Sequence, residues 1–244
     1  MQAAVDDVVR VLRPRIKHLL DEHLDGQRVL FGAVSAELLP LVDAAAELVG
    51  TGKRLRPAFC YWGWRGAGAP DDPGILRAAA SLELFHAAAL IHDDLIDGSE
   101  IRRGLPSMHR RFAGIHQQAG WDGDAQRFGA AAAVLVGDLC LGWSDELFHG
   151  CGLPAAALQR GRTVYERMRT EVMGGQYLDV LEQAAGATSP AGQVDRARQV
   201  IRYKSAKYSV ERPLVLGGSL AGAGPALLAC YSTYGLQLGE AFQL

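Results

Sequence analysis

Three aspartates gather in the segment DDLID, at the end of a long apolar stretch. Asp93 and Asp97 are four residues apart, so on a helix they share one face, whereas Asp94 points about 100° away. Carboxylates at the C-terminal end of a helix oppose its macrodipole and repel one another. Such a cluster is typical of a site for a hard divalent cation, above all Mg²⁺ shared with substrate phosphates. The alternative interpretation is a solvated acidic helix end.

Basic side chains flank the acidic segment in the sequence. They are Lys53, Arg54, Arg56, Arg102, Arg103 and, two helical turns before Asp93, His86. Arginine forks match phosphate oxygens bidentately, although most such pairs are simply solvated and a lone histidine in an apolar helix is more often a core residue. A site that combines metal-binding carboxylates with several basic side chains predicts two phosphorylated substrates. One would be held through Mg²⁺ and the other directly by the basic side chains.

The elements that must position these residues are helices almost throughout, because the apolar periodicity is helical and strand signals are scarce. We expect helices at residues 3–23, 28–49, 57–67, 74–97, 107–118, 126–149, 155–184, 191–211 and 225–244, separated by Pro- and Gly-rich segments. Residues 75–92 and 128–143 are apolar nearly all round, which predicts burial at the centre of a bundle. One all-α domain spanning residues 1–244 follows.

The composition excludes several classes of protein. Apolar residues make up 49% of the chain, charged residues 21%, and the net charge is −2, so no general attraction to nucleic acid or to anionic membranes is expected. The cysteines, at 60, 140, 151 and 230, form no CxxC pair and are expected to be buried free thiols in a reducing cytoplasm. No signal peptide and no run of about 18 apolar residues is evident, so we expect no stable membrane span.

These segments together resemble the trans-prenyltransferase (polyprenyl diphosphate synthase) family, especially its geranylgeranyl diphosphate synthases. The matching segments occur in the family's order and are GKRLRP (52–57), ELFH (83–86), DDLID (93–97), RRGLPSMH (102–109), GGQYLD (174–179), YKSAKYS (203–209) and LGEAFQL (238–244). The resemblance implies the isoprenoid-synthase fold, a helical bundle around a central apolar cavity. It also implies a Mg²⁺-dependent enzyme that condenses isopentenyl diphosphate with an allylic diphosphate, and a cytoplasmic homodimer.

The resemblance also assigns roles to individual residues. Asp93, Asp94 and Asp97 match the first aspartate-rich motif, which holds the allylic diphosphate through Mg²⁺. The positions that match isopentenyl diphosphate contacts are Lys53, Arg56, His86 and Arg103. Arg102 and Lys204 match direct contacts to the allylic diphosphate, and Ser205 stands where the family often has threonine. The further polar positions of the cleft are Gln176, Asp179 and Gln243, of which Gln176 and Asp179 have a structural hydrogen-bonding role as the alternative.

Product length is expected to depend on the helix that carries the aspartates. In the family a bulky residue one turn before the aspartates stops the chain at farnesyl length. Here Ala88 and Ala89 occupy that turn and Phe85 lies one turn further back, which predicts geranylgeranyl diphosphate if Phe85 forms the floor. If Phe85 instead packs sideways into the core, longer products are expected.

Three alternatives to this enzyme remain open. In the family, the second aspartate-rich motif usually follows a segment like LGEAFQL directly, but this chain stops at Leu244, so we expect a further C-terminal part. A true end there would favour a non-catalytic subunit of a heteromeric synthase. A farnesyl or longer-chain synthase has the same motifs, and a class I terpene cyclase shares the fold but needs no isopentenyl diphosphate site.

Overall fold

The computed structural model describes residues 2–185 and 192–243 and, for side chains, residues 11–184 and 192–243. The described chain is helical apart from one two-stranded hairpin, which confirms the expected all-α class. It divides into two compact units. Unit 1 comprises Met1–Lys53 and Ala80–Gly150, and unit 2 comprises Arg54–Ala79 and Cys151–Leu244. The expected single domain therefore stays a prediction.

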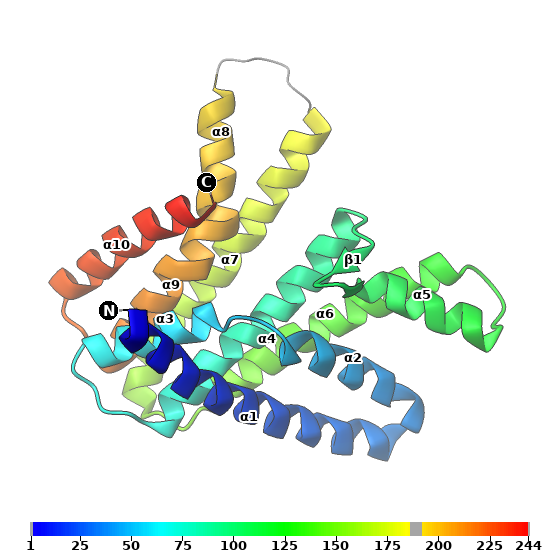
Figure 1. Ribbon diagram of the computed structural model, residues 1–244, viewed down its shortest axis with the longest axis horizontal. Helices are drawn as coiled ribbons and strands as arrows, with labels where there is room; N and C mark the ends of the chain where they lie inside the picture. Colours follow the sequence, from blue (N-terminus) through cyan, green and yellow to red (C-terminus); the bar gives the residue numbers. More distant parts are fainter. Residues whose placement is uncertain (1, 186–191, 244) are drawn as a thin grey trace. The chain divides into compact units, whose positions relative to one another are not determined.

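Unit 1 begins with a helical hairpin. Helix α1 (Gln2–Val34) leads through a 3₁₀ turn, η1 (Ala36–Leu38), into α2 (Leu39–Gly50), which runs back alongside it (Figure 1). Leu12, Ile16, Leu20 and Leu24 recur every four residues along α1 and are all buried, which gives this helix one continuous apolar face.

The rest of unit 1 surrounds the acidic segment. Helix α4 (Pro73–Ile96), which belongs to unit 1 from Ala80 onward, ends at that segment and is followed by the antiparallel strands β1 (Ile101–Arg102) and β2 (Leu105–Pro106). The two turn residues, Arg103 and Gly104, both have positive φ, 55° and 82°, as a type I′ hairpin requires. Helices α5 (Met108–Ala119) and α6 (Ala125–His149) then pack together through Gly129, where a Cβ atom would collide with the backbone of α5.

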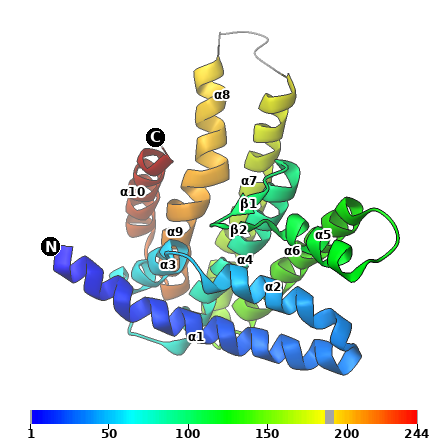
Figure 2. The same cartoon turned by 45° about the vertical axis from the view of Figure 1, so that its right-hand side comes forward.

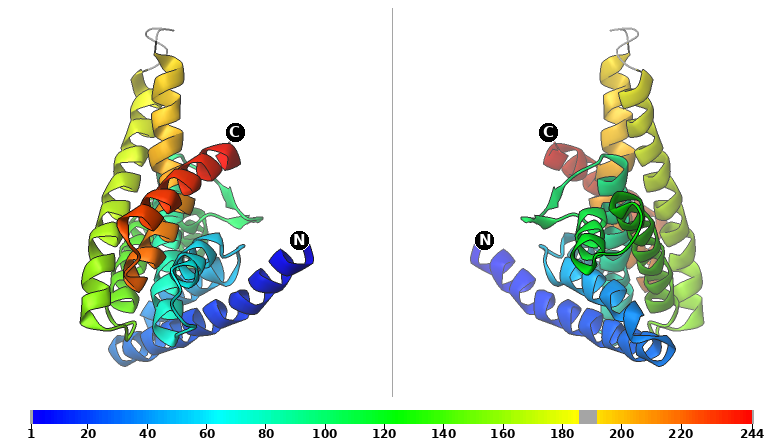
Figure 3. Two further views of the ribbon diagram at one scale, coloured as in Figure 1. Left: turned by 90° about the vertical axis from the view of Figure 1, so that its left-hand side faces the viewer. Right: turned by 90° about the vertical axis from the view of Figure 1, so that its right-hand side faces the viewer.

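Unit 2 is built around one long helical rod. Helix α8 (Gln193–Val200), the π-helical segment η2 (Ile201–Glu211) and α9 (Arg212–Ala221) follow one another without a break, and α7 (Ala155–Ala185) runs antiparallel to α8 and η2 (Figure 2). Helix α3 (Leu55–Gly66) packs on α9 through glycines of both helices, and α10 (Pro225–Gln243) lies along η2 (Figure 3).

The structure corrects several sequence expectations. Helix α1 continues through residues 24–27 to Val34, so the expected helix at 28–49 is wrong; its second half alone corresponds to α2. Residues 212–221 fall outside the expected helices but form helix α9, which packs on α3. The hairpin was also missed, because strands of two residues have no periodicity to detect.

The cysteine and membrane expectations need qualification too. Cys60, Cys140 and Cys151 are buried free thiols, whereas Cys230 is exposed. Burial raises the pKa of the Cys140 thiol to about 12. Among the described residues, α4 and α6 are long and apolar enough to cross a membrane by length and composition. Most of the apolar window of α4 is buried, as in a core helix, and this evidence for a span is weak.

Candidate functional site

The acidic segment closes helix α4. The N–H of Asp97 donates to the Asp93 carbonyl at 2.8 Å and that of Ser99 to the Asp94 carbonyl at 2.9 Å, and the helix ends here, where Gly98 has a φ of 64°. The three carboxylates have different environments. The Asp93 side chain is 20% exposed, Asp94 is only 2% exposed, and Asp97 is largely exposed. The different orientation expected for Asp94 is therefore reflected in its burial.

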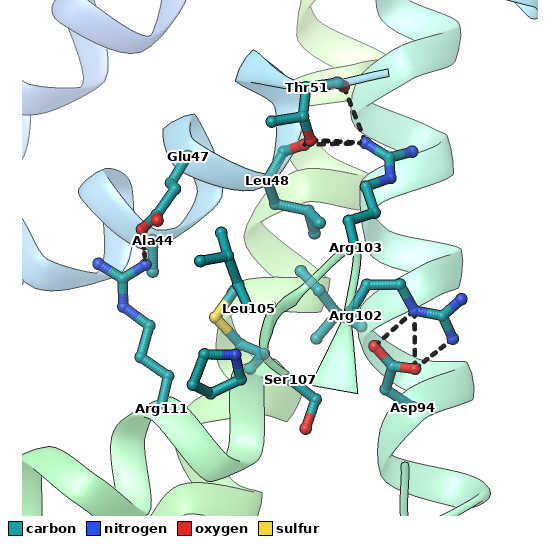
Figure 4. Close-up of a pocket in the computed structure, with 13 residues that line it drawn as sticks. Ala44, Glu47, Leu48, Thr51, Asp94, Arg102, Arg103, Leu105, Ser107 and Arg111 are labelled. Carbon is teal, nitrogen blue, oxygen red and sulfur yellow. Dashed lines mark hydrogen bonds and ion pairs between the residues drawn. The ribbon is translucent and has the colours of Figure 1, made fainter. Parts of the chain in front are cut away.

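Arg102 binds the buried carboxylate. Its Nε donates to Asp94 Oδ1 and Oδ2 at 2.9 and 3.0 Å, and its Nη2 also donates to Oδ1 (Figure 4). Nη2 lies 3.6 Å from an oxygen of Asp93. The hydrogen bonds to Asp94 raise the pKa of the Arg102 guanidinium above its ordinary value, and the charges of Asp93 and Asp97 raise it further. Arg102, which the resemblance assigns to a substrate phosphate, is thus hydrogen-bonded to Asp94 in this structure.

Arg103 points in a different direction from Arg102. Its Nη1 donates to the Thr51 carbonyl at 2.8 Å, to Thr51 Oγ1 at 2.9 Å and to the Leu48 carbonyl at 3.3 Å (Figure 4). The turn explains the divergence, because Arg103 has the left-handed conformation at the hairpin tip while Arg102 lies in β1. Arg103 therefore binds the C-terminal end of α2, where carbonyl oxygens attract a cation.

A cavity of about 200 Å³ lies beside the two arginines in unit 1. Its walls come from α2, α4, the hairpin and α5, and an ion pair between Glu47 and Arg111 lines one side (Figure 4). Asp94 and both arginines also contribute to the lining. The cavity combines apolar and charged walls, which suits a ligand with both characters.

The other expected residues of unit 1 lie along α4 and the loop before α3. Lys53 is exposed and His86 is half-buried. Phe85 is 1% exposed and Ala88 is fully buried, whereas Ala89 is only half-buried. The burial of Phe85 fits both the chain-length floor and the alternative of packing in the core, so its role stays a prediction.

In unit 2, Lys204 is held by Asp179. Lys204 Nζ lies 2.6 Å from Asp179 Oδ2, which brings together two residues expected from the resemblance. Gly175 of α7 packs against the backbone at Lys204, and a Cβ atom there would collide with the Lys204 amide nitrogen. Gln176 Nε2 is buried and no described residue accepts a hydrogen bond from it, and both roles expected for Gln176 stay predictions.

The remaining expected residues of unit 2 differ in burial. Arg56 Nη2 donates to Ser209 Oγ at 2.7 Å, and its guanidinium lies 4.2 Å from the Tyr208 ring centroid. Ser205 is half-buried on η2, and Gln243 is exposed at the end of α10. Sequence reasoning missed Tyr208 and Ser209 as partners of Arg56, although both lie in or beside the segment YKSAKYS that it singled out.

A charged network around Glu171 was also missed. Lys207 and Arg212 both donate to the Glu171 carboxylate at 2.8–2.9 Å, and Arg167 lies 3.9 Å away. Burial alone would raise the pKa of Glu171, but the hydrogen bonds from Arg212 and Lys207 outweigh it and lower the pKa. Only the i,i+4 spacing of Arg167 and Glu171 hints at this network in the sequence.

The donor set at the end of α4 fits a hard divalent cation. Asp93 and Asp97 lie four residues apart on the helix, and both carboxylates retain exposure to solvent. Within residues 2–185 and 192–243, no three His, Cys, Asp or Glu side chains already form a metal-binding group. A cation here would therefore need further oxygen ligands, as Mg²⁺ commonly obtains from water and substrate phosphates.

Comparison with known proteins agrees with the all-α fold. The family model for polyprenyl synthetase matches residues 40–244. The chain belongs to the polyprenyl synthetase family, and its fold is that of the isoprenyl synthases.

Individual relatives show how similar the chain is to known members of the family in sequence and in structure. The chain is 26% identical to a geranylgeranyl diphosphate synthase of Methanosarcina mazei over 100% of its own length and 61% of that protein. It is 32% identical to a (2E,6E)-farnesyl diphosphate synthase of Mycobacterium tuberculosis over 79% of its length and 47% of that protein. The crystal structure of a geranylgeranyl pyrophosphate synthase from Corynebacterium glutamicum, complexed with isoprenyl diphosphate and magnesium, matches with a TM-score of 0.89 and 37% identity, over 98% and 66% of the two chains.

Proposed function

We propose that the protein is a chain-elongating prenyltransferase that condenses isopentenyl diphosphate with an allylic diphosphate. The observation that carries the proposal is the end of α4, where the exposed Asp97 and the partly exposed Asp93 lie beside the Asp94–Arg102 pair. A cluster with this excess of negative charge reduces the stability of the folded protein unless a bound cation compensates it. The likeness to synthases that make farnesyl and geranylgeranyl diphosphates supports the same chemistry.

The proposed reaction needs no protein nucleophile. The C–O bond of the allylic diphosphate breaks, and the diphosphate leaves with the electron pair. The double bond of isopentenyl diphosphate then attacks the allylic cation, and a proton lost to the released diphosphate restores a double bond. When bound by Asp93 and Asp97, Mg²⁺ neutralises charge on the leaving group.

The basic residues have distinct tasks in this proposal. Arg102 exchanges its bond to Asp94 for the allylic diphosphate, and Lys204 exchanges its bond to Asp179 for the same group. Lys53, Arg56, His86 and Arg103 bind isopentenyl diphosphate. Preorganised cations lower the barrier because they are in place before charge develops on the leaving oxygen.

A product assay tests the proposal. The full-length protein is incubated with isopentenyl diphosphate and, in turn, dimethylallyl, geranyl and farnesyl diphosphate, with Mg²⁺ or with a chelator. We expect longer all-trans prenyl diphosphates with Mg²⁺ alone. Cyclic hydrocarbons made from a single substrate would instead identify a terpene cyclase, and no product from any primer would favour a non-catalytic subunit.

For the product we propose geranylgeranyl diphosphate, with Phe85 as the floor for the growing chain. Ala89→Phe should then shorten the main product toward farnesyl diphosphate, because the ring fills the path. Phe85→Ala should lengthen it, and it should cost about 3–5 kcal/mol of stability because the ring is buried. Chromatography of the dephosphorylated products measures both, and an unchanged distribution in both variants would contradict a role for this helix face.

We also propose a cytoplasmic homodimer. Helix α6 carries the exposed apolar side chains Phe128, Val134 and Leu135, which a second copy would cover. Light scattering of the purified protein checks the mass, and cell fractionation checks the compartment. A monomer at micromolar concentration would contradict the dimer.

A further inference from the structure

Two arginines from distant parts of unit 1 bind the loop that leads to Lys53. Arg13 of α1 donates from Nη2 to the Gly52 carbonyl at 3.0 Å, and Arg103 donates from Nη1 to the Thr51 carbonyl at 2.8 Å. Thr51 Oγ1 also donates to the Leu48 carbonyl at 3.1 Å. Successive carbonyl groups of this loop are thus fixed by side chains rather than by regular secondary structure.

The conformation of Gly52 explains why the loop needs these side-chain contacts. Its φ is +124°, a conformation that side chains rarely allow, and a Cβ atom at this position would lie 3.1 Å from Arg103 Nη1. Glycine therefore permits the turn, but it also gives the free loop more conformational freedom than any other residue. Contacts from outside the loop are needed to select one conformation.

The Gly52 carbonyl is directly coupled to Lys53. Its oxygen belongs to the planar peptide group that contains the Lys53 nitrogen, so a hydrogen bond to that oxygen sets the orientation of this plane. The plane fixes the N–Cα bond of Lys53, from which the exposed side chain leaves the backbone.

We propose that Arg13 is a positioning residue for Lys53 and hence for isopentenyl diphosphate binding. Arg103 fixes the preceding peptide and Arg13 fixes the peptide that joins Gly52 to Lys53. The inference rests on the proposed function for the identity of the ligand, but the effect of Arg13 on the loop does not.

Helix α1 offers a matched control. Lys17 lies one turn after Arg13, also carries a positive charge, and pairs with Asp21 at 2.5 Å on the exposed surface. Lys17→Ala therefore removes the same charge from the same helix without touching the loop. A long-range electrostatic effect would be common to both variants, whereas a positioning effect belongs to Arg13 alone.

The test compares Arg13→Ala, Arg13→Lys and Lys17→Ala in the full-length protein. Loss of one hydrogen bond should raise the KM for isopentenyl diphosphate about threefold to tenfold in Arg13→Ala. The KM for the allylic substrate and the thermal midpoint should not change, and Arg13→Lys should recover part of the loss. An unchanged KM, an equal rise in both KM values, or the same effect in Lys17→Ala would overturn the proposal.

A second measurement does not depend on activity. A protease that cuts after lysine should cleave faster at Lys53 in Arg13→Ala than in the wild type or Lys17→Ala, because the loop is released. If the wild type forms no prenyl product, the proposed function fails and this measurement alone decides the role of Arg13. Equal cleavage at Lys53 in all three proteins would then overturn it.

Discussion

The end of α4 in unit 1 and the segment η2 in unit 2 both concentrate charged side chains, but they balance them differently. At the end of α4, Arg102 lies in the field of Asp93, Asp94 and Asp97, so these four groups leave an excess of negative charge. Along η2, Lys204 pairs with Asp179, and Lys207 and Arg212 pair with Glu171. The first region has an excess of negative charge that a bound cation would balance, whereas both carboxylates of the second region already have cationic partners within the protein.

The two regions use charged side chains for different purposes, ligand binding in the first and structural stability in the second. An excess of like charge at a helix end reduces stability and is useful only when a ligand compensates it. Paired and partly buried charges instead hold neighbouring elements in one arrangement, and losing one partner is costly. Substitutions in the first region should therefore affect turnover, and substitutions around η2 should affect stability or the placement of Lys204.

The largest effect should come from Asp93→Ala. Losing a carboxylate for Mg²⁺ should reduce kcat about 10²–10³-fold, as for other groups that stabilise charge in a transition state. The thermal midpoint should not fall, because the variant removes repulsion at a helix end. Steady-state kinetics and thermal unfolding measure the two quantities. Asp138→Ala, at an exposed carboxylate on α6, is the control, and near-normal turnover in Asp93→Ala would contradict the metal assignment.

Arg102→Ala and Arg103→Ala should separate the two substrates. Each removes a charge-assisted contact worth about 1.5–3 kcal/mol. Arg103→Ala should mainly raise the KM for isopentenyl diphosphate, and Arg102→Ala should mainly disturb the allylic substrate. Only Arg102→Ala should also clearly lower the thermal midpoint, because it deprives the buried Asp94 of its bidentate partner. If both variants raised the same KM equally, the two assignments would be wrong.

The neighbouring glycines of α7 offer a smaller and very specific test. Gly175→Ala places a methyl group against the backbone at Lys204 and should cost about 1–3 kcal/mol of stability, with a fall in kcat as Lys204 is displaced. A Cβ atom at Gly174 meets no atom within 4 Å, so Gly174→Ala should stabilise the helix by about 0.5–1 kcal/mol. Denaturant unfolding of both variants measures the contrast, and similar values for the two would refute the close approach.

The smallest effect concerns acid stability. The pKa of Glu171 is lowered in the folded protein, so its stabilising contribution is present above the ordinary glutamate pKa of 4.5 and is lost as the pH falls through the lower folded value. Glu171→Gln should be less stable than the wild type near neutral pH, and the difference should shrink below about pH 4.5. Urea unfolding of both proteins across this pH range measures the difference in the free energy of unfolding. A difference that does not depend on pH would show that Glu171 acts through packing alone.

Much of the molecule follows from local sequence. The helical periodicity predicts α3, α4, α5, α6, α7 and α10 to within about two residues, because it depends only on which residues recur along one face. The acidic segment is equally local, since Asp93, Asp94 and Asp97 are placed by the geometry of a single helix. Even the distinct burial of Asp94 follows from its angle to Asp93.

Tertiary packing decided what these residues contact. The bonds of Arg103 to Thr51, of Arg13 to Gly52 and of Arg56 to Ser209 join positions that are distant in sequence, and no periodicity relates such positions. Helix α9 packs closely against α3 because Gly217 of α9 and Gly63 of α3 have no side chain to keep the two backbones apart. The sequence by itself determined most of the helices and the acidic cluster, since these arise from neighbours along the chain. The tertiary structure alone decided the partner of each arginine, because a long flexible cation binds whichever carbonyl or carboxylate the fold brings within reach.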